Sequence, residues 1–226
     1  MDDTRQVLGL IFLFAVFSCT APQQTVKVAP APDKVKITTD SGVIVLKLYD
    51  KTPKHRDNFI KLIKDGFYNG TLFHRTVNDF MIQGGDPESR NAKPGVLLGE
   101  GSLGYKIPPE FDSTLFHKRG ALAAARENND KNPEKLSNAS QFYIVDGKVL
   151  NDQQLDKVEE RFNIKIPESH RMFYRTNGGD PWLDMNYTVF GEVITGMDVV
   201  EKIANAPKDK NNRPLNDIKM TVTLIK

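Results

Sequence analysis

The residues best suited to chemistry gather in one stretch, residues 72–86, where a cation, an amide and several apolar side chains lie close together. Arg75 supplies a guanidinium, Gln83 an amide, and Phe80 and Met81 an aromatic ring and a thioether. None of these groups is a nucleophile, and arginine stays protonated, so it cannot act as an ordinary acid or base. The stretch therefore favours binding and electrostatic stabilisation over covalent chemistry.

The same stretch predicts a β-hairpin that would hold these groups together. Residues 72–77 favour a strand, Asn78 and Asp79 favour a turn, and residues 80–83 favour a returning strand. Because alternate residues of a strand share a face, Arg75 should point the same way as Val77. The glycine pair at 84–85 then allows the backbone to turn tightly.

This pattern resembles the signature of the cyclophilin-type peptidyl-prolyl cis-trans isomerases. The resemblance covers about residues 35–226 apart from one insertion, and it rests on Phe73-His74-Arg75, Phe80-Met81-x-Gln83-Gly84-Gly85-Asp86, residues 120–126, 140–144, 182–184 and 189–193. It implies a mainly β fold, a closed eight-stranded antiparallel barrel capped by two helices, with its site on the outer surface. It also implies that proline-containing polypeptides are the substrates.

The reaction of that family suits a site without a nucleophile. The peptide bond before a proline rotates slowly because resonance gives it partial double-bond character, and uncatalysed rotation takes tens of seconds. Twisting the bond localises a lone pair on the proline nitrogen. A catalyst needs a pocket for the ring and a hydrogen-bond donor aimed at that nitrogen, and Arg75 is the candidate donor. No cofactor or metal is expected.

The resemblance assigns a role to each matched position. Arg75 would stabilise the twisted bond, and Gln83 would bind and orient the substrate backbone. The other matched positions would bind substrate, with a proline pocket of Phe80, Met81, Tyr143 and Leu183, a neighbouring groove of Ala125, Arg126 and Gln141, and a lip at Trp182. For Phe80, Met81, Trp182 and Leu183, plain core packing is the alternative.

Three positions depart from the family pattern. Tyr143 stands where phenylalanine is common, Arg126 where asparagine is frequent, and Tyr187, which is also expected to bind substrate, where many members have histidine. Aromatic character survives at position 143, so the pocket should persist. Peptide preference is less constrained.

Other chemistries find little support in the chain. There is no Gly-x-Ser-x-Gly elbow of a serine hydrolase, and the four histidines show no helical pairing for a metal. His55 is expected to be solvated in the first turn of a helix, and His74 to make structural hydrogen bonds. Residues 99–104 have the spacing of a dinucleotide-binding loop, but Pro108 and Pro109 follow where a helix should begin, which favours a flexible loop beside the groove.

Length and composition predict one globular domain. The chain has 226 residues, of which 39% are hydrophobic and 27% charged. The net charge is +2, and it becomes +3 without the first eighteen residues, which carry Asp2, Asp3 and Arg5. No basic stripe indicates nucleic acid as a partner. A single cysteine excludes an internal disulfide.

The N-terminus predicts export. The apolar run at 7–17 is too short to cross a bilayer as a helix but suits a signal peptide. Residues 16–19 (Val-Phe-Ser-Cys) resemble a bacterial lipoprotein processing site, so we expect a signal at 1–18, lipidation of Cys19 and a membrane anchor. Phe17 is bulky for such a site, and a plain secretory signal is the alternative. The Pro- and Ala-rich residues 19–34 predict an extended tether.

Hydrophobic periodicity predicts the remaining elements. Strands are expected over 35–39, 43–49, 120–125, 140–145, 188–193 and 218–224, and the two principal helices over 53–66 and 197–204. Residues 146–181 form the insertion. It should hold one helix after a capping box at Asn151 and Gln154, and a second helix from Pro167 to Asn177. A part in substrate choice and a purely decorative role are both compatible with its place beside the site.

The sequence thus predicts an exported, lipid-anchored, monomeric isomerase for proteins that fold outside the cytoplasm. A peptide-binding or chaperone module with little isomerase activity is the main alternative. A membrane-tethered assembly subunit is a third interpretation.

Overall fold

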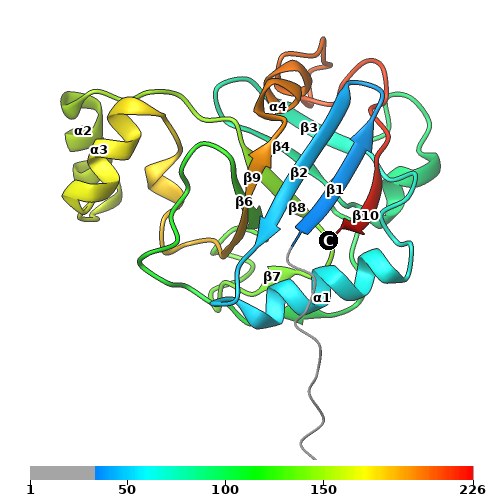
Figure 1. Ribbon diagram of the computed structural model, residues 1–226, viewed down its shortest axis with the longest axis horizontal. Helices are drawn as coiled ribbons and strands as arrows, with labels where there is room; N and C mark the ends of the chain where they lie inside the picture. The colour runs from blue at the N-terminus through cyan, green and yellow to red at the C-terminus, as the bar shows by residue number, and fades with distance from the viewer. Residues whose placement is uncertain (1–33, 226) are drawn as a thin grey trace, which may run out of the picture. The chain divides into compact units, whose positions relative to one another are not determined.

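Eight antiparallel strands form one curved sheet in the computed structural model, which describes residues 34–225 (Figure 1). The predicted signal, Cys19 and nearly all of the predicted tether lie outside these residues. The strand order is β10-β1-β2-β9-β6-β8-β4-β3. The strands are β1 (Lys34–Thr39), β2 (Gly42–Leu48), β3 (Phe73–Val77), β4 (Met81–Gly84), β6 (Ala121–Ala124), β8 (Phe142–Val145), β9 (Val189–Thr195) and β10 (Thr221–Ile225), and the short β5 (Lys106–Ile107) pairs with β7 (Ser137–Asn138).

The prediction of a closed barrel is wrong, because the sheet is open between its edge strands β3 and β10. β10 pairs along its length with β1 and forms no ladder with β3. The two edges meet only where the chain enters each strand. There, Phe73 N–H donates to the Ile218 carbonyl and Met220 N–H to the Thr71 carbonyl, both at 2.9 Å, beside an isolated bridge between Leu72 and Lys219.

The two faces of the sheet carry different clusters, because successive strand residues point to opposite sides. The inner face contributes to the main hydrophobic core with Ile82, Leu122, Ala124, Phe142 and Ile144. The outer face carries a second, smaller cluster that includes Met81, Ala121, Ala123, Tyr143 and Val145. Phe142 and Ile144 thus face the core and Tyr143 faces the other way, as the alternation expected along a strand at 140–145 requires. The outer cluster is the base on which the candidate site is built.

Two helices pack against the sheet, as predicted. In Figure 1, α1 (Pro53–Lys64) and α4 (Met197–Ala204) lie at opposite ends of the strands. α1 contacts β9 and β10, and α4 contacts β2, β3 and β4. Their apolar sides, including Phe59, Ile63 and Val200, are buried in the main core.

The first turn of α1 differs from its prediction. Thr52 occupies the N-cap position, but its side chain makes no capping hydrogen bond. The Glu110 carboxylate instead accepts from the N–H groups of Lys54 and His55 at 3.1 and 3.0 Å. His55 was expected to be solvated, yet it is buried, with Nδ1 2.7 Å from Glu110 Oε2 and Nε2 3.0 Å from Ser137 Oγ. Burial lowers the His55 pKa despite the opposing effect of Glu110.

The insertion contains the two predicted helices, α2 (Asp152–Phe162) and α3 (Glu168–Thr176), beside the sheet in Figure 1. Asn151 and Gln154 form the predicted capping box, with reciprocal bonds of 2.9 Å. The insertion has a small core of its own, built from Leu150, Leu155, Ile166 and Tyr174. The largely buried Arg171 of α3 joins the two helices through ion pairs with Asp152 and Asp156 of α2. The chain leaves the insertion through Pro181–Leu183, a 3₁₀ turn labelled η2.

Residues 87–91 form the other short 3₁₀ turn, η1 (Pro87–Asn91). Its N-cap is Asp86, whose side chain accepts from Glu88 N–H at 2.8 Å.

Within residues 34–225, no helix is long and apolar enough to span a membrane.

The capping box makes the stability of α2 testable. Replacing Asn151 with alanine leaves the Gln154 N–H without its side-chain acceptor, so the free energy of unfolding should fall by about 1 kcal/mol. Urea denaturation measures it. Asn151→Ser keeps a capping oxygen and should retain most of the stability. An unchanged midpoint and unchanged amide exchange in α2 for Asn151→Ala would contradict this account.

Candidate active site

The register of neighbouring strands brings three predicted site residues into one row. Arg75 on β3 lies opposite Gln83 on β4, and Gln83 lies opposite Tyr143 on β8. Residues directly opposite one another on antiparallel strands share a face. All three therefore lie on the outer face, above the second hydrophobic cluster.

These residues line an open cavity of about 360 Å³. Its wall contains nine of the predicted residues, namely Arg75, Phe80, Met81, Gln83, Ala125, Arg126, Tyr143, Leu183 and Tyr187. Gln141 lies instead in an adjoining cavity of about 340 Å³, which shares Gln83, Ala125 and Arg126 with the first. The predicted pocket and its neighbouring groove are thus adjacent hollows on one face.

Trp182, the predicted lip, lines neither cavity. Its partly buried side chain packs against the core of the insertion, and its ring centroid lies 6.1 Å from that of Phe80. Trp182 therefore contacts the pocket only through Phe80 and connects that ring to the core of the insertion.

The Arg75 guanidinium is half-buried above an aromatic ring. Its central carbon lies 5.7 Å from the centroid of Phe80, a cation–π distance. Nη1 lies 3.5 Å from Gln83 Oε1 and 3.7 Å from Met81 Sδ, at the long limit for hydrogen bonds. In residues 34–225, no carboxylate forms an ion pair with Arg75. Burial lowers the pKa of Arg75, but an arginine remains charged.

A chain of amides orients Gln83. Gln141 Nε2 lies 2.9 Å from the carbonyl oxygens of both Gly99 and Gly101, so this atom donates and Gln141 Oε1 faces the other way. Oε1 accepts from Gln83 Nε2 at 3.0 Å. The Gln83 oxygen then faces Arg75, and the Gln83 amide keeps one N–H that has no acceptor among the described residues. The row thus presents donors to the cavity.

The turn of the hairpin is tied to the start of the insertion. The Phe80 carbonyl accepts from the N–H groups of Asp146 and Gly147, at 2.8 and 3.0 Å. Asp146 Oδ2 in turn accepts from Asp79 N–H at 3.0 Å. These bonds hold Phe80, and with it the ring beneath Arg75.

The arrangement can hold an apolar ring in the cavity and donate hydrogen bonds from a charged group to a polar atom of the same bound molecule. A family model described as cyclophilin-type peptidyl-prolyl cis-trans isomerase/CLD matches residues 34–224. This chain belongs to the cyclophilin-type family of peptidyl-prolyl cis-trans isomerases. It is therefore an enzyme of that class.

Similar proteins agree with this assignment. Relatives from Staphylococcus saprophyticus and Staphylococcus haemolyticus, both provisionally named peptidyl-prolyl cis-trans isomerases, are 36% and 35% identical over 203 and 198 residues; each alignment covers 87% of this chain and 93% of the relative. A cyclophilin-type isomerase from Cryptosporidium parvum superimposes with a TM-score of 0.63 at 25% identity, covering 86% of this chain and 98% of that one. A second structure of that protein, in the presence of the dipeptide Ala-Pro, gives a TM-score of 0.62 at 26% identity, covering 85% and 99%.

Two of the departures from the usual cyclophilin pattern are in contact. The Arg126 guanidinium lies 4.4 Å from the centroid of the Tyr187 ring. Arg126 Nε also donates to the Asn186 carbonyl at 2.7 Å, and its Nη1 to the Glu127 carbonyl at 2.9 Å. Arg126 therefore fixes the Tyr187 side of the cavity, a positioning that the sequence does not reveal.

Several wall residues of this cyclophilin site were missed from the sequence. They are His74, Leu98, Gly99, Glu100 and Asn128. The glycine spacing of 99–104 was the available signal for the loop, which does lie beside the groove. His74 was expected to make structural hydrogen bonds, but neither ring nitrogen has a partner in residues 34–225. Burial lowers the pKa of His74 to about 4, which favours a neutral ring.

One acidic residue of the insertion is buried without a hydrogen-bond partner. Both carboxyl oxygens of Asp180 lack one among the described residues, and the side chain is fully buried. Burial, with the nearby charges of Asp146 and Asp184, raises the pKa of Asp180 to about 9. The same part of the chain contains no cluster of three acidic, histidine or cysteine side chains able to hold a metal. Asp180 is therefore protonated at neutral pH.

Asp180 should make stability depend on pH. Between about pH 4 and pH 9 the folded state keeps this proton while the unfolded state releases it, so the free energy of unfolding falls as pH rises. Asp180→Asn removes this dependence, so its gain in stability over the wild type should grow by roughly 2 kcal/mol or more from pH 5 to pH 8.

Urea denaturation at several pH values measures the difference, in which contributions from histidines common to both proteins cancel. Asp40→Asn, which changes an exposed carboxyl in the turn after β1, is the matched control and should leave the profile unchanged. Parallel profiles for Asp180→Asn and the wild type would refute a buried, protonated Asp180.

Proposed function

We propose that the cavity around Arg75 is where this cyclophilin rotates the peptide bond before proline, in proteins that fold outside the cytoplasm. The observation that carries the proposal is a guanidinium without a counter-ion in residues 34–225, held over Phe80 beside Met81 and Tyr143 in one hollow. An apolar pocket can bury a proline ring, and the cation can act on the atom where charge develops.

In this mechanism Arg75 donates to the proline nitrogen as the bond twists. The planar amide nitrogen is a poor acceptor because its lone pair is delocalised, whereas the twisted nitrogen carries a localised pair. The hydrogen bond therefore forms in the transition state and not in either planar form, which is the condition for acceleration. A charge-assisted bond in a partly desolvated site contributes about 2–4 kcal/mol.

Gln83 and the pocket wall hold the substrate for this step. The free N–H of the Gln83 amide, which Gln141 orients, can donate to a substrate carbonyl next to the proline. Met81, Tyr143 and Leu183 provide the apolar wall. The Cryptosporidium parvum cyclophilin studied in the presence of Ala-Pro supports a proline peptide as the ligand of this pocket.

Arg75→Ala should lower kcat/KM by about 30- to 1000-fold, which corresponds to the loss of the charged hydrogen bond. Binding of a proline peptide should change only a few-fold, because the apolar wall remains. A protease-coupled proline isomerisation assay and calorimetric titration measure the two quantities on residues 34–226.

Arg161→Ala, which removes an exposed arginine of α2, is the control and should keep the wild-type rate. A wild-type rate in Arg75→Ala would place the chemistry elsewhere. Peptide binding by a wild-type protein that does not accelerate isomerisation would favour the alternative, a peptide-binding or chaperone module.

We also propose that the enzyme is exported as a monomeric lipoprotein. Support comes from the apolar run at 7–17 and from Cys19, which begins the Pro- and Ala-rich tether at residues 19–34. Removal of residues 1–18 would leave Cys19 as the lipidated first residue. The tether would hold the isomerase a few tens of Å from the membrane at about 3 Å per residue.

Cys19→Ser in the full-length chain should abolish lipid incorporation and move the protein from the membrane fraction to the soluble fraction of a bacterial host. Radiolabelled fatty acid and cell fractionation measure both effects. Ser18→Ala leaves the cysteine in place and should stay lipidated. A wild-type protein that is cleaved but carries no lipid would instead support the plain secretory signal.

A further inference from the structure

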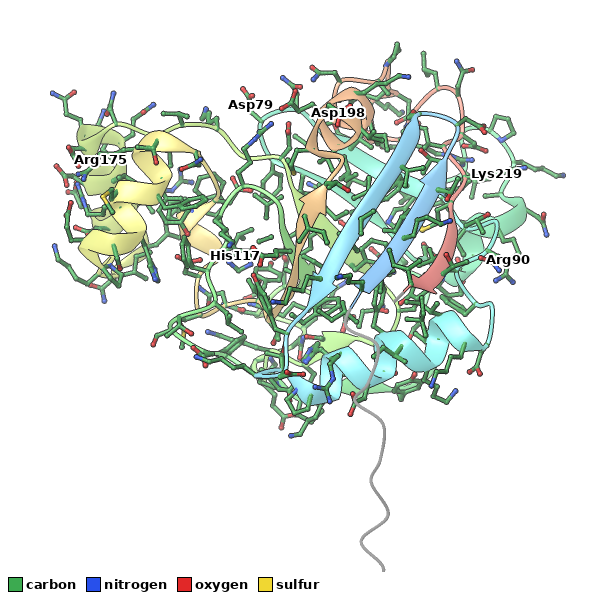
Figure 2. All side chains as sticks on the ribbon, in the orientation of Figure 1. Asp79, Arg90, His117, Arg175, Asp198 and Lys219 are labelled. Atoms are coloured by element: carbon green, nitrogen blue, oxygen red, sulfur yellow. The ribbon has the colours of Figure 1, made fainter. Side chains whose placement is uncertain are left out.

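A chain of four polar side chains runs from the insertion to the floor of the proline pocket. The Tyr174 hydroxyl on α3 donates a hydrogen bond to Asp184 Oδ2 at 2.7 Å. Asp184 Oδ1 lies 2.9 Å from His117 Nδ1, and His117 Nε2 lies 2.9 Å from the Tyr143 hydroxyl. In Figure 2, His117 is labelled between the strands of the sheet and the helices of the insertion.

The direction of each hydrogen bond follows from the groups themselves. An ionised carboxylate can only accept, so His117 Nδ1 carries the hydrogen that points to Asp184. In the neutral imidazole Nε2 is then an acceptor, and the Tyr143 hydroxyl donates to it. Asp184 Oδ1 also accepts from His117 N–H at 2.8 Å, which fixes the ring and its backbone together. The Tyr143 hydroxyl is thus held in one position.

Burial strengthens this chain. The side chains of Tyr174 and His117 are fully buried and Tyr143 is 5% exposed, so the bond between His117 and Tyr143 is shielded from water, while Asp184 is partly buried. Low local polarity strengthens hydrogen bonds and makes an unpaired polar group costly. Burial raises the pKa of both Tyr143 and Tyr174, which keeps each hydroxyl protonated as a donor.

Backbone contacts anchor the same segment to the insertion. Asp180 N–H donates to the His117 carbonyl at 2.9 Å, and Arg119 N–H donates to the Gly178 carbonyl at 3.0 Å. Phe116, next to His117, packs into the small core of the insertion. The position of His117 therefore follows that of the insertion.

We propose that Tyr174, Asp184 and His117 are positioning residues, through which the insertion sets the position of the Tyr143 ring in the cavity that Arg75 also lines. None of the three lines the pocket of about 360 Å³. The chain requires a tyrosine at position 143, where phenylalanine is common in the family, because a phenylalanine ring has no hydroxyl to hold. This inference rests on the proposed role of the cavity as the isomerisation site.

The position of the Tyr143 ring should affect catalysis more than it affects peptide binding. Burial of a proline ring is non-directional and tolerates a small displacement. The hydrogen bond from Arg75 to the twisted nitrogen is directional and weakens steeply when misaligned. A Tyr143 ring that is no longer held in place should therefore lower kcat while leaving KM nearly unchanged.

A double-mutant cycle between Tyr174→Phe and Tyr143→Phe tests the proposal. Tyr174→Phe should lower kcat by about three- to tenfold, with KM and peptide affinity within about twofold of wild type. In the Tyr143→Phe background, Tyr174→Phe should have no further effect, since residue 143 then has no hydroxyl for His117 to hold. Asp184→Asn, which weakens the same chain while keeping its shape, should behave like Tyr174→Phe and serves if that variant folds poorly.

Tyr68→Phe is the matched control. It removes another fully buried tyrosine hydroxyl, which donates to the Ser140 carbonyl at 3.1 Å in the main core. Its effect on stability should resemble that of Tyr174→Phe, but its effect on kcat should be small and additive with Tyr143→Phe.

Equal kcat losses in Tyr174→Phe and Tyr68→Phe, or additive effects of Tyr174→Phe and Tyr143→Phe, would overturn the proposal. Failure of the proposed function would look different. In that case Arg75→Ala would keep its rate, whatever the cycle shows.

Discussion

The structure of the site depends on keeping a positive charge partly out of water without a neutralising partner. A half-buried guanidinium loses hydration, and a carboxylate would normally compensate for it. Around Arg75 the compensation comes from weaker partners, the face of Phe80, the sulfur of Met81 and the oxygen of Gln83. A carboxylate would stabilise the resting enzyme and reduce the pull on a substrate nitrogen. The weak partners leave the cation available.

These weak partners must be held by the rest of the fold. Gln83 points its oxygen at Arg75 because Gln141 takes one of its N–H groups, and Gln141 is fixed by the Gly99–Gly101 backbone. Phe80 stays beneath the cation because its carbonyl is bonded to the first residues of the insertion. The charge is thus positioned by neutral hydrogen bonds from three separate segments. A small displacement of any of these three segments therefore changes the contacts of the Arg75 guanidinium.

The insertion shares this pattern of buried polar contacts. It is connected to the sheet by the Tyr174–Asp184–His117–Tyr143 hydrogen bonds and by the exit of the chain past Asp180. The Asp184 carboxylate accepts several hydrogen bonds there, whereas the carboxyl oxygens of Asp180, fully buried nearby, have no partner in residues 34–225. Asp180 shows how burial of a carboxyl without a partner favours its protonated form.

Local patterns in the sequence were sufficient for the elements and for most of the site. Strand alternation separated Phe142 and Ile144 from Tyr143, and the Asn151–Gln154 capping box located α2, because both patterns are set by neighbouring residues. The family resemblance then placed Arg75, Gln83 and the pocket residues, nine of which line one cavity.

Tertiary structure decided whatever depends on partners far along the chain. The sheet is open because β10 pairs with β1 and only its entry touches β3, an outcome of sheet curvature that no local pattern encodes. His55 is buried because Glu110, 55 positions away in the chain, caps its helix. Trp182 packs behind Phe80, and His117 reaches Tyr143, through contacts between segments that only folding brings together. Sequence periodicity reports which face a side chain occupies, but long-range packing determines what that side chain meets.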